Sequence, residues 1–144
     1  MTAMPTDGVP RPIGLLLASP AIALAARLAL ASPFLISGIA KLLDFSGTIN
    51  EMAAFGLAPA GLFAAVVIAT QLGGSALSLM PRTCWLGAGI LVVFTVIATL
   101  LAHPFWAFTV ADRPQQMATF FEHAAIVGGL AMAAIHAQQA SRGA

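Results

Sequence analysis

The chain has 144 residues, of which 60% are hydrophobic and only 8% are charged. A soluble domain of this size needs more polar surface, because roughly 25% of the residues in such domains are charged. The composition therefore excludes an ordinary soluble globule and predicts that lipid covers most of the protein. The formal net charge of +1 also excludes a nucleic-acid-binding surface, which needs clustered Lys and Arg side chains.

The N-terminal residues 1–12 are polar and rich in Pro and Gly, and we expect them to be mobile. The apolar stretch that follows Arg11 and ends in small residues, Ala23 to Ala26, could also belong to a cleaved signal peptide. Cleavage there would leave only Arg27 to Leu43 for the first membrane span, so an uncleaved span is favoured.

Four apolar runs are long enough to cross a bilayer, which takes about 20 residues, and turn-forming residues separate them. The expected spans are residues 20–43, 59–80, 83–103 and 117–138. Residues 139–144 form a short polar tail that we expect to be mobile. The sequence therefore predicts a single all-α domain over residues 1–144, a polytopic membrane four-helix bundle.

The connection between the first two spans, residues 44–57, has a helical pattern of its own. Phe45, Ile49 and Met52 share one face of a helix, while Asn50 and Glu51 point away from it. This pattern predicts a short interfacial helix, and the alternative is a simple loop.

The basic residues of the loops predict the orientation of the bundle. Arg11, Arg82 and Arg142 lie on the side of the two termini, whereas Lys41 and Arg113 lie on the other side. The positive-inside rule therefore places both termini in the cytoplasm. Cys84 is the single cysteine, so the chain cannot form an internal disulfide, and cysteine content says nothing about the compartment.

Each span carries one polar or small-residue stripe at helical spacing. The stripes are Arg27, Ala31, Phe34, Gly38 and Lys41; Gln71, Ser75 and Ser78, with Gly74 at the edge; Thr95, Thr99 and His103; and Glu122, Ile126, Gly129, Ala133 and His136. Polar and ionic side chains are costly among acyl chains, so we expect the four stripes to face one another inside the bundle.

Depth along antiparallel helices, at about 1.5 Å per residue, pairs residues of different spans. On this basis we predict that Arg27 contacts Gln71 and that Lys41 contacts Glu122. Each residue also has a purely structural interpretation: Arg27 could extend to the headgroups, Lys41 could anchor the interface, and Gln71 could join two helices.

His103 and His123 lie at a similar depth, which is compatible with two axial haem ligands. They have no flanking haem signature, and the adjacent pair Glu122-His123 matches no metal motif because neighbouring helical residues point about 100° apart. No Cys and His residues have zinc spacing either. The sequence therefore predicts neither a haem nor a metal site.

A set of residues between about 20 and 135 resembles the DoxX family of membrane proteins. The set is Arg27, Phe34, the run Ser37-Gly38-Ile39-Ala40-Lys41, Phe45, Gly73-Gly74, Arg82, His103, Phe121 and Gly128-Gly129. The resemblance implies a small four-helix protein, often of the bacterial cytoplasmic membrane. Some relatives are subunits of thiosulfate:quinone oxidoreductases, others are associated with quinone or oxidative stress, and many have no assigned activity.

Two positions depart from the pattern of that family. Gln71 stands where the family usually has a glutamate, and Glu122-His123 stands where it usually has Lys-Asn. Either Glu122 replaces the missing carboxylate as the counter-charge of Arg27 and Lys41, or the site has lost a function that relatives retain.

The stripes and the resemblance together predict a small membrane subunit, associated with a redox system, that binds a quinone-like or other small molecule in a polar intramembrane pocket. The candidate pocket residues are Arg27, Lys41, Gln71, His103, Glu122 and His123. Flavin, haem and iron-sulfur motifs are absent from the sequence, so no intrinsic cofactor is expected, and a partner subunit or soluble enzyme would supply one. The alternatives are a non-enzymatic scaffold or assembly factor and, third, a small-molecule carrier; oligomers are compatible with each, and whether a reaction is catalysed stays open.

Overall fold

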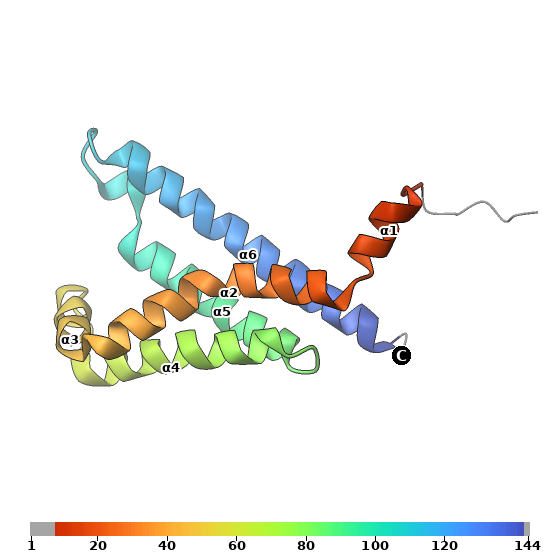
Figure 1. Ribbon diagram of the computed structural model, residues 1–144. Helices are drawn as coiled ribbons and strands as arrows, with labels where there is room; N and C mark the ends of the chain where they lie inside the picture. The colour runs from red at the N-terminus through yellow and green to blue at the C-terminus, as the bar shows by residue number, and fades with distance from the viewer. Residues whose placement is uncertain (1–7, 143–144) are drawn as a thin grey trace, which may run out of the picture.

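The structure is a computed structural model that describes the backbone of residues 8–142, and these residues form helices joined by short connections. In chain order the helices are α1 (Arg11–Leu17), α2 (Pro20–Leu43), α3 (Phe45–Ala54), α4 (Ala60–Leu79), α5 (Cys84–Ala102), the 3-10 turn η1 (Phe105–Ala107) and α6 (Arg113–Arg142) (Figure 1). α2, α4, α5 and α6 are long and apolar enough to cross a membrane. The predicted all-α membrane bundle is confirmed.

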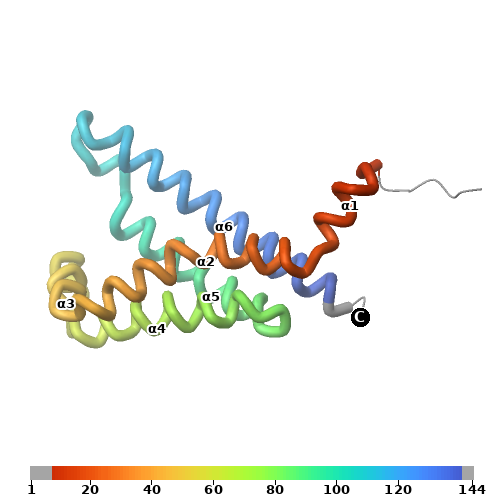
Figure 2. The backbone as a smooth tube through the Cα atoms, viewed as in Figure 1, coloured from red at the N-terminus to blue at the C-terminus, as the bar shows by residue number. Residues whose placement is uncertain are grey.

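The four long helices pack as two antiparallel pairs. α4 lies against α2 on one side and against α5 on the other, and α5 lies against α6. Figures 1 and 2 show that the second pair is tilted against the first, so the start of α6 lies well away from the end of α2. We call the end of the bundle that carries α3 the α3 end, and the opposite end, with residues 80–83 between α4 and α5, the turn end.

The observed helix bounds agree closely with the predicted spans except for α6. α2 has the predicted bounds, while α6 begins at Arg113 and extends to Arg142. Pro114 does not prevent this early start, because the first turn of a helix leaves its N–H groups unpaired in any case. Residues 11–12 and 139–142 are helical, while residues 1–7 and 143–144 lie outside the described residues, and the expected mobility of both ends stays a prediction.

α2 continues through Pro33, which cannot donate the backbone hydrogen bond that the carbonyl of Ala29 would normally accept. The Ser32 hydroxyl donates to this carbonyl instead, at 2.8 Å. A polar group in a bilayer must be paired within the protein, so the Ser32-Pro33 pair keeps the span satisfied.

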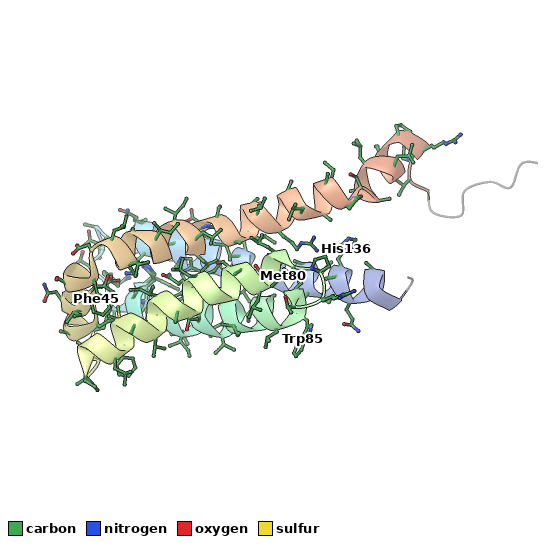
Figure 3. All side chains as sticks on the ribbon, turned by 60° about the horizontal axis from the view of Figure 1, so that its bottom comes forward. Phe45, Met80, Trp85 and His136 are labelled. Carbon is green, nitrogen blue, oxygen red and sulfur yellow. The ribbon has the colours of Figure 1, made fainter. Side chains whose placement is uncertain are left out.

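The connection after α2 is a helix, as predicted. Thr48 and Met52 are buried, whereas Phe45 is exposed at the α3 end (Figure 3). The Asp44 side chain accepts from the Gly47 backbone N–H at 2.9 Å and caps α3. The Thr48 hydroxyl lies 3.0 Å from the Lys41 carbonyl oxygen, so it ties α3 to the end of α2.

The interior of the bundle combines a small apolar core with the predicted polar stripes. Phe34, Ala88, Leu91 and Leu130 form the core, and the rings of Phe34 and Phe94 meet edge to face at 6.3 Å. The stripes of the first three spans are buried or half-buried, as predicted. The fourth stripe holds in its middle, where Ile126, Gly129 and Ala133 are half-buried, but it is wrong at its two ends, because Glu122 and His136 are exposed.

Gly129 marks the place where α6 packs closely against α2. A Cβ added at Gly129 would lie only 2.7 Å from Leu30 Cδ2, so this glycine lets the Leu30 side chain of α2 approach the α6 backbone. Leu130, the next residue of α6, is buried in the core, and Leu30 packs against the same core. Glu122 lies about two turns earlier, near the start of α6, and is exposed.

Candidate functional site

Lys41 and Glu51 form an ion pair at the α3 end, between the last turn of α2 and the middle of α3. The side chain of Lys41 is 18% exposed and that of Glu51 is 43% exposed. Solvent therefore partly screens the attraction between the two charges. The short break at Asp44 sets α3 across the end of α2, which brings Glu51 beside Lys41 (Figure 1).

The predicted contact between Lys41 and Glu122 is therefore wrong. Lys41 is paired with Glu51, and Glu122 is exposed on α6. Figure 1 shows the physical reason, because the tilt of the second helix pair carries the start of α6 away from the end of α2. Counting depth along parallel axes cannot reveal this tilt.

The Lys41–Glu51 pair gives a prediction with a small effect. Replacing Glu51 by Gln is expected to cost about 1 kcal/mol or less, because exposed and half-exposed ion pairs contribute little to stability. Lys41→Met should cost a similar amount, and the double variant should cost less than the sum. Reversible unfolding in mixed detergent measures these differences, and additive single effects would contradict the pairing.

Gln71 lies in the interior of the bundle and joins α4 to α2. It is 5% exposed, and its Nε2 donates to Ser37 Oγ at 3.1 Å. Its Oε1 and the hydroxyl of Ser75, one turn away, are buried without a hydrogen-bond partner in the described part of the chain. Arg27 could donate only to Oε1, and Oε1 has no partner within the described residues, so the predicted contact between Arg27 and Gln71 is not formed as a hydrogen bond.

Arg27 lies nearer the turn end than Gln71 does. Together with Ser78 and Cys84 it lines a narrow gap between α2, the end of α4 and the start of α5. The charged guanidinium of Arg27 lies beside the Cys84 thiol. The Cys84 Sγ also lies 3.7 Å from the Ala133 carbonyl oxygen of α6. Arg27 Nε is buried without a partner among the described residues. Arg27 lies beside Ser78, and Gln71 lies seven residues before Ser78, about 10 Å along α4. This distance explains why the side chains of Arg27 and Gln71 do not meet.

His103 and His123 meet at the α3 end, between α5 and α6. Their rings lie edge to face with centroids 5.2 Å apart. His103 Nδ1 lies 2.7 Å from Gln116 Oε1, and His123 Nδ1 lies 2.8 Å from Thr99 Oγ1. Both predicted histidines thus have one ring nitrogen fixed by a neighbour, while the Lys41–Glu51 pair lies between α2 and α3.

A groove between α5 and α6 lies beside His123 and has a volume of about 210 Å³. We call it the His123 groove; its lining residues are Val96, Thr99, Leu100, Phe120, His123, Ala124 and Val127. Val96, Leu100 and Ala124 are exposed within membrane spans, so the groove opens toward lipid. Phe120 belongs to an aromatic cluster with Phe105, Trp106 and Phe121 at the same end.

Comparison with known proteins supports the membrane assignment. The sequence model of the DoxX family matches residues 22–104, which is more than half of the chain. The chain belongs to the DoxX family. The match includes α2 to α5 and stops before α6, so His103 lies within the matched region and His123 lies outside it.

One curated relative of this DoxX-family protein is inner membrane protein YphA of Escherichia coli strain K12. The two are 28% identical over 119 residues, which is 82% of this chain and 84% of the relative. The relative and the four apolar helices indicate a bacterial inner-membrane protein. No solved structure matches the chain significantly.

The structure separates the six candidate residues into different places. Only His103 and His123 contact each other, while Lys41, Gln71 and Arg27 follow one another along the α2 side and Glu122 is exposed. Within residues 8–140 the structure contains no group of three or more His, Cys, Asp or Glu side chains that could hold a metal ion.

Sequence reasoning missed several partners of these residues. Ser37, Glu51, Thr99 and Gln116 complete the contacts of Gln71, Lys41, His123 and His103. The sequence predicts that Thr99 faces the interior, but it does not predict the contact of Thr99 with His123. Gln116 could have been found by extending the fourth span back to Pro114, because His103 ends α5 directly opposite the start of α6.

Proposed function

We propose that this DoxX-family protein binds a lipophilic, quinone-like small molecule in the His123 groove. The observation that supports this best is the position of His123 in the wall of a groove that opens to lipid. A molecule dissolved in the bilayer can enter from the side and meet one polar group in otherwise apolar surroundings, which is typical of small-molecule sites. Ionisable residues inside membrane spans commonly mark such sites.

The size of the groove limits the part of the ligand that it can hold. A cavity of roughly 150 Å³ accepts benzene, so about 210 Å³ accommodates one substituted ring. A hydrocarbon tail would remain outside and lie along the exposed surface of α5 and α6. The ring would contact Phe120 and the aliphatic lining residues, with its polar end at His123.

The proposal moves the pocket away from the centre of the bundle. Arg27, Lys41 and Gln71 do not line the His123 groove, and we assign them to holding the helices together. His103 supports the His123 ring from behind. We propose further that a partner subunit or soluble enzyme supplies any cofactor needed for electron transfer, and that cytoplasmic termini place the groove in the outer half of the membrane.

Loss of the His123 ring is expected to weaken binding about tenfold, because the ligand loses its single hydrogen-bonding partner in the groove. The probe is a decyl-substituted benzoquinol, kept under anaerobic conditions and added to protein in nanodiscs. A Trp85→Phe background leaves Trp106 as the single tryptophan, and Trp106 lies 6.0 Å from the Phe120 ring that lines the groove. Quenching of Trp106 fluorescence then measures occupancy.

The matched control is His136→Ala, which removes an exposed histidine of the same helix near the turn end (Figure 3). It should leave binding unchanged. Filling the groove with Ala124→Trp should abolish binding by steric exclusion, although this variant adds a second fluorophore and needs calorimetry. Equal affinities for the native protein and His123→Ala would refute the assignment of the ligand to this groove.

The exposure of α6 favours a scaffold as the second candidate function. Only 6% of the apolar 18-residue segment of α6 is buried, compared with 22–33% of the corresponding segments in the other three spans. Gly128 faces open space, so another helix could approach closely there. A partner from native membranes that stays bound to His123→Ala protein, combined with no ligand binding by the native protein, would favour the scaffold.

A further inference from the structure

We infer that the His123 groove selects the reduced, hydroxyl-bearing form of its ligand, a quinol or a similar phenol, because Thr99 fixes His123 as a hydrogen-bond acceptor. This inference rests on the proposed function and names the form of the ligand. It follows from the hydrogen bonds that join Thr95, Thr99 and His123, because the number of protons on these groups decides which atom donates in each bond.

The Thr99 hydroxyl has one proton, and the backbone uses it. Thr99 Oγ1 lies 2.6 Å from the carbonyl oxygen of Thr95, one turn earlier in α5. A carbonyl oxygen only accepts, and two oxygens at this distance repel each other unless a proton lies between them. Thr99 therefore donates to Thr95, in the pattern common for threonines in helices.

The same hydroxyl must then accept a hydrogen bond from His123. His123 Nδ1 lies 2.8 Å from Thr99 Oγ1, and the only proton left for this bond is on the ring nitrogen. A neutral imidazole carries one N–H, so the proton on Nδ1 leaves Nε2 with a lone pair. A ligand that binds at His123 Nε2 must therefore donate a hydrogen bond to this nitrogen.

The other groups around the groove supply no competing donor. His103 Nδ1 lies 2.7 Å from the amide oxygen of Gln116, which assigns its proton to Nδ1 and leaves its Nε2 as an acceptor too. Besides Thr99 and His123, the lining side chains are aliphatic or aromatic. A quinone carbonyl only accepts and finds no partner here, whereas a quinol O–H can donate to His123 Nε2.

Three matched ligands test this preference in nanodiscs at pH 8, where an imidazole of ordinary basicity is neutral. They are a decyl-substituted benzoquinol kept under anaerobic conditions, the corresponding quinone, and the dimethyl ether of the quinol. We expect the quinol to bind about tenfold more tightly than the other two, measured by calorimetry, because only the quinol donates. Equal binding of quinol and quinone overturns the inference and leaves the proposed function intact; no binding of any ligand overturns both.

Replacing Thr99 by Val should remove the preference, because His123 can then carry its proton on Nε2 and donate to a quinone. The quinol-to-quinone ratio should fall to about twofold or less. Thr99→Ser keeps the hydroxyl and should keep the native ratio. A native ratio in Thr99→Val would overturn the assignment of selectivity to Thr99.

A measurement on the native protein tests the tautomer without any ligand. Nitrogen-15 spectra of histidine-labelled protein distinguish a protonated Nδ1 from a protonated Nε2, and the His123 signals are assigned by their absence from His123→Ala. We expect protonated Nδ1 and unprotonated Nε2. The opposite tautomer would overturn the inference even if Thr99→Val failed to fold.

Discussion

Gly87→Ala is expected to destabilise the protein by about 3 kcal/mol, one of the two largest effects that we predict. Gly87 lies where α5 crosses α4, and an added Cβ would overlap the Ser78 backbone N–H. It would also lie 2.6 Å from the Gly74 carbonyl oxygen and 2.7 Å from the Leu77 carbonyl carbon. Backbone atoms within a helix cannot move aside as a side chain can, so the two helices would have to separate.

The control for this prediction lies two residues further along the same helix. An added Cβ at Gly89 would meet nothing within 4 Å. Gly89→Ala should therefore leave stability unchanged or raise it by up to about 1 kcal/mol through helix propensity. Unfolding of both variants by a denaturing detergent compares them directly, and similar losses for both would show that the crossing is not limited by contact at Gly87.

The sequence was sufficient to predict the spans because length and hydropathy alone decide whether a helix can cross a bilayer. It also predicted the inward faces of α2, α4 and α5, where polar residues such as Gln71 and Thr99 mark one side of an apolar helix. On α6 the same reasoning succeeded for Ile126, Gly129 and Ala133 and failed at Glu122 and His136. The charge of Glu122 suggested an inward face, but a residue near the start of a span can reach the interface and face outward.

The contacts within the candidate site were less predictable than the helices. Lys41 pairs with Glu51 and not with Glu122 because helix tilt and the break at Asp44 decide the neighbours, and neither has a signal in residue spacing. The meeting of His103 and His123 followed from depth alone, since they lie on consecutive antiparallel helices joined by a short connection. Depth failed for Lys41 and Glu122 across the tilted bundle. It also failed for Arg27 and Gln71 on the packed helices α2 and α4, where Gln71 pairs with Ser37.

Leu91→Ala is expected to destabilise the protein by about 2 kcal/mol, because Leu91 is fully buried in the core and its removal leaves a cavity. In a membrane the transfer of a leucine from lipid to protein gains little, so packing supplies most of this effect. Leu86 is 40% exposed on the same helix, and Leu86→Ala should change stability by about 0.5 kcal/mol or less. Equal losses would mean that the helices do not pack around Leu91.

The partner of Leu91 permits a sharper version of this experiment. A Cβ added at Gly74 would lie 2.9 Å from both Cγ and Cδ2 of Leu91, so α4 provides the space that the leucine fills. Gly74→Ala should cost about 1 kcal/mol in the native background, because the end of the Leu91 side chain must shift. With Leu91→Ala present the added methyl group enters the cavity, and the double variant should be more stable than the sum of the single effects predicts by about 1 kcal/mol. Additive losses would show that Gly74 and Leu91 do not pack together, and would place the contact between α4 and α5 elsewhere.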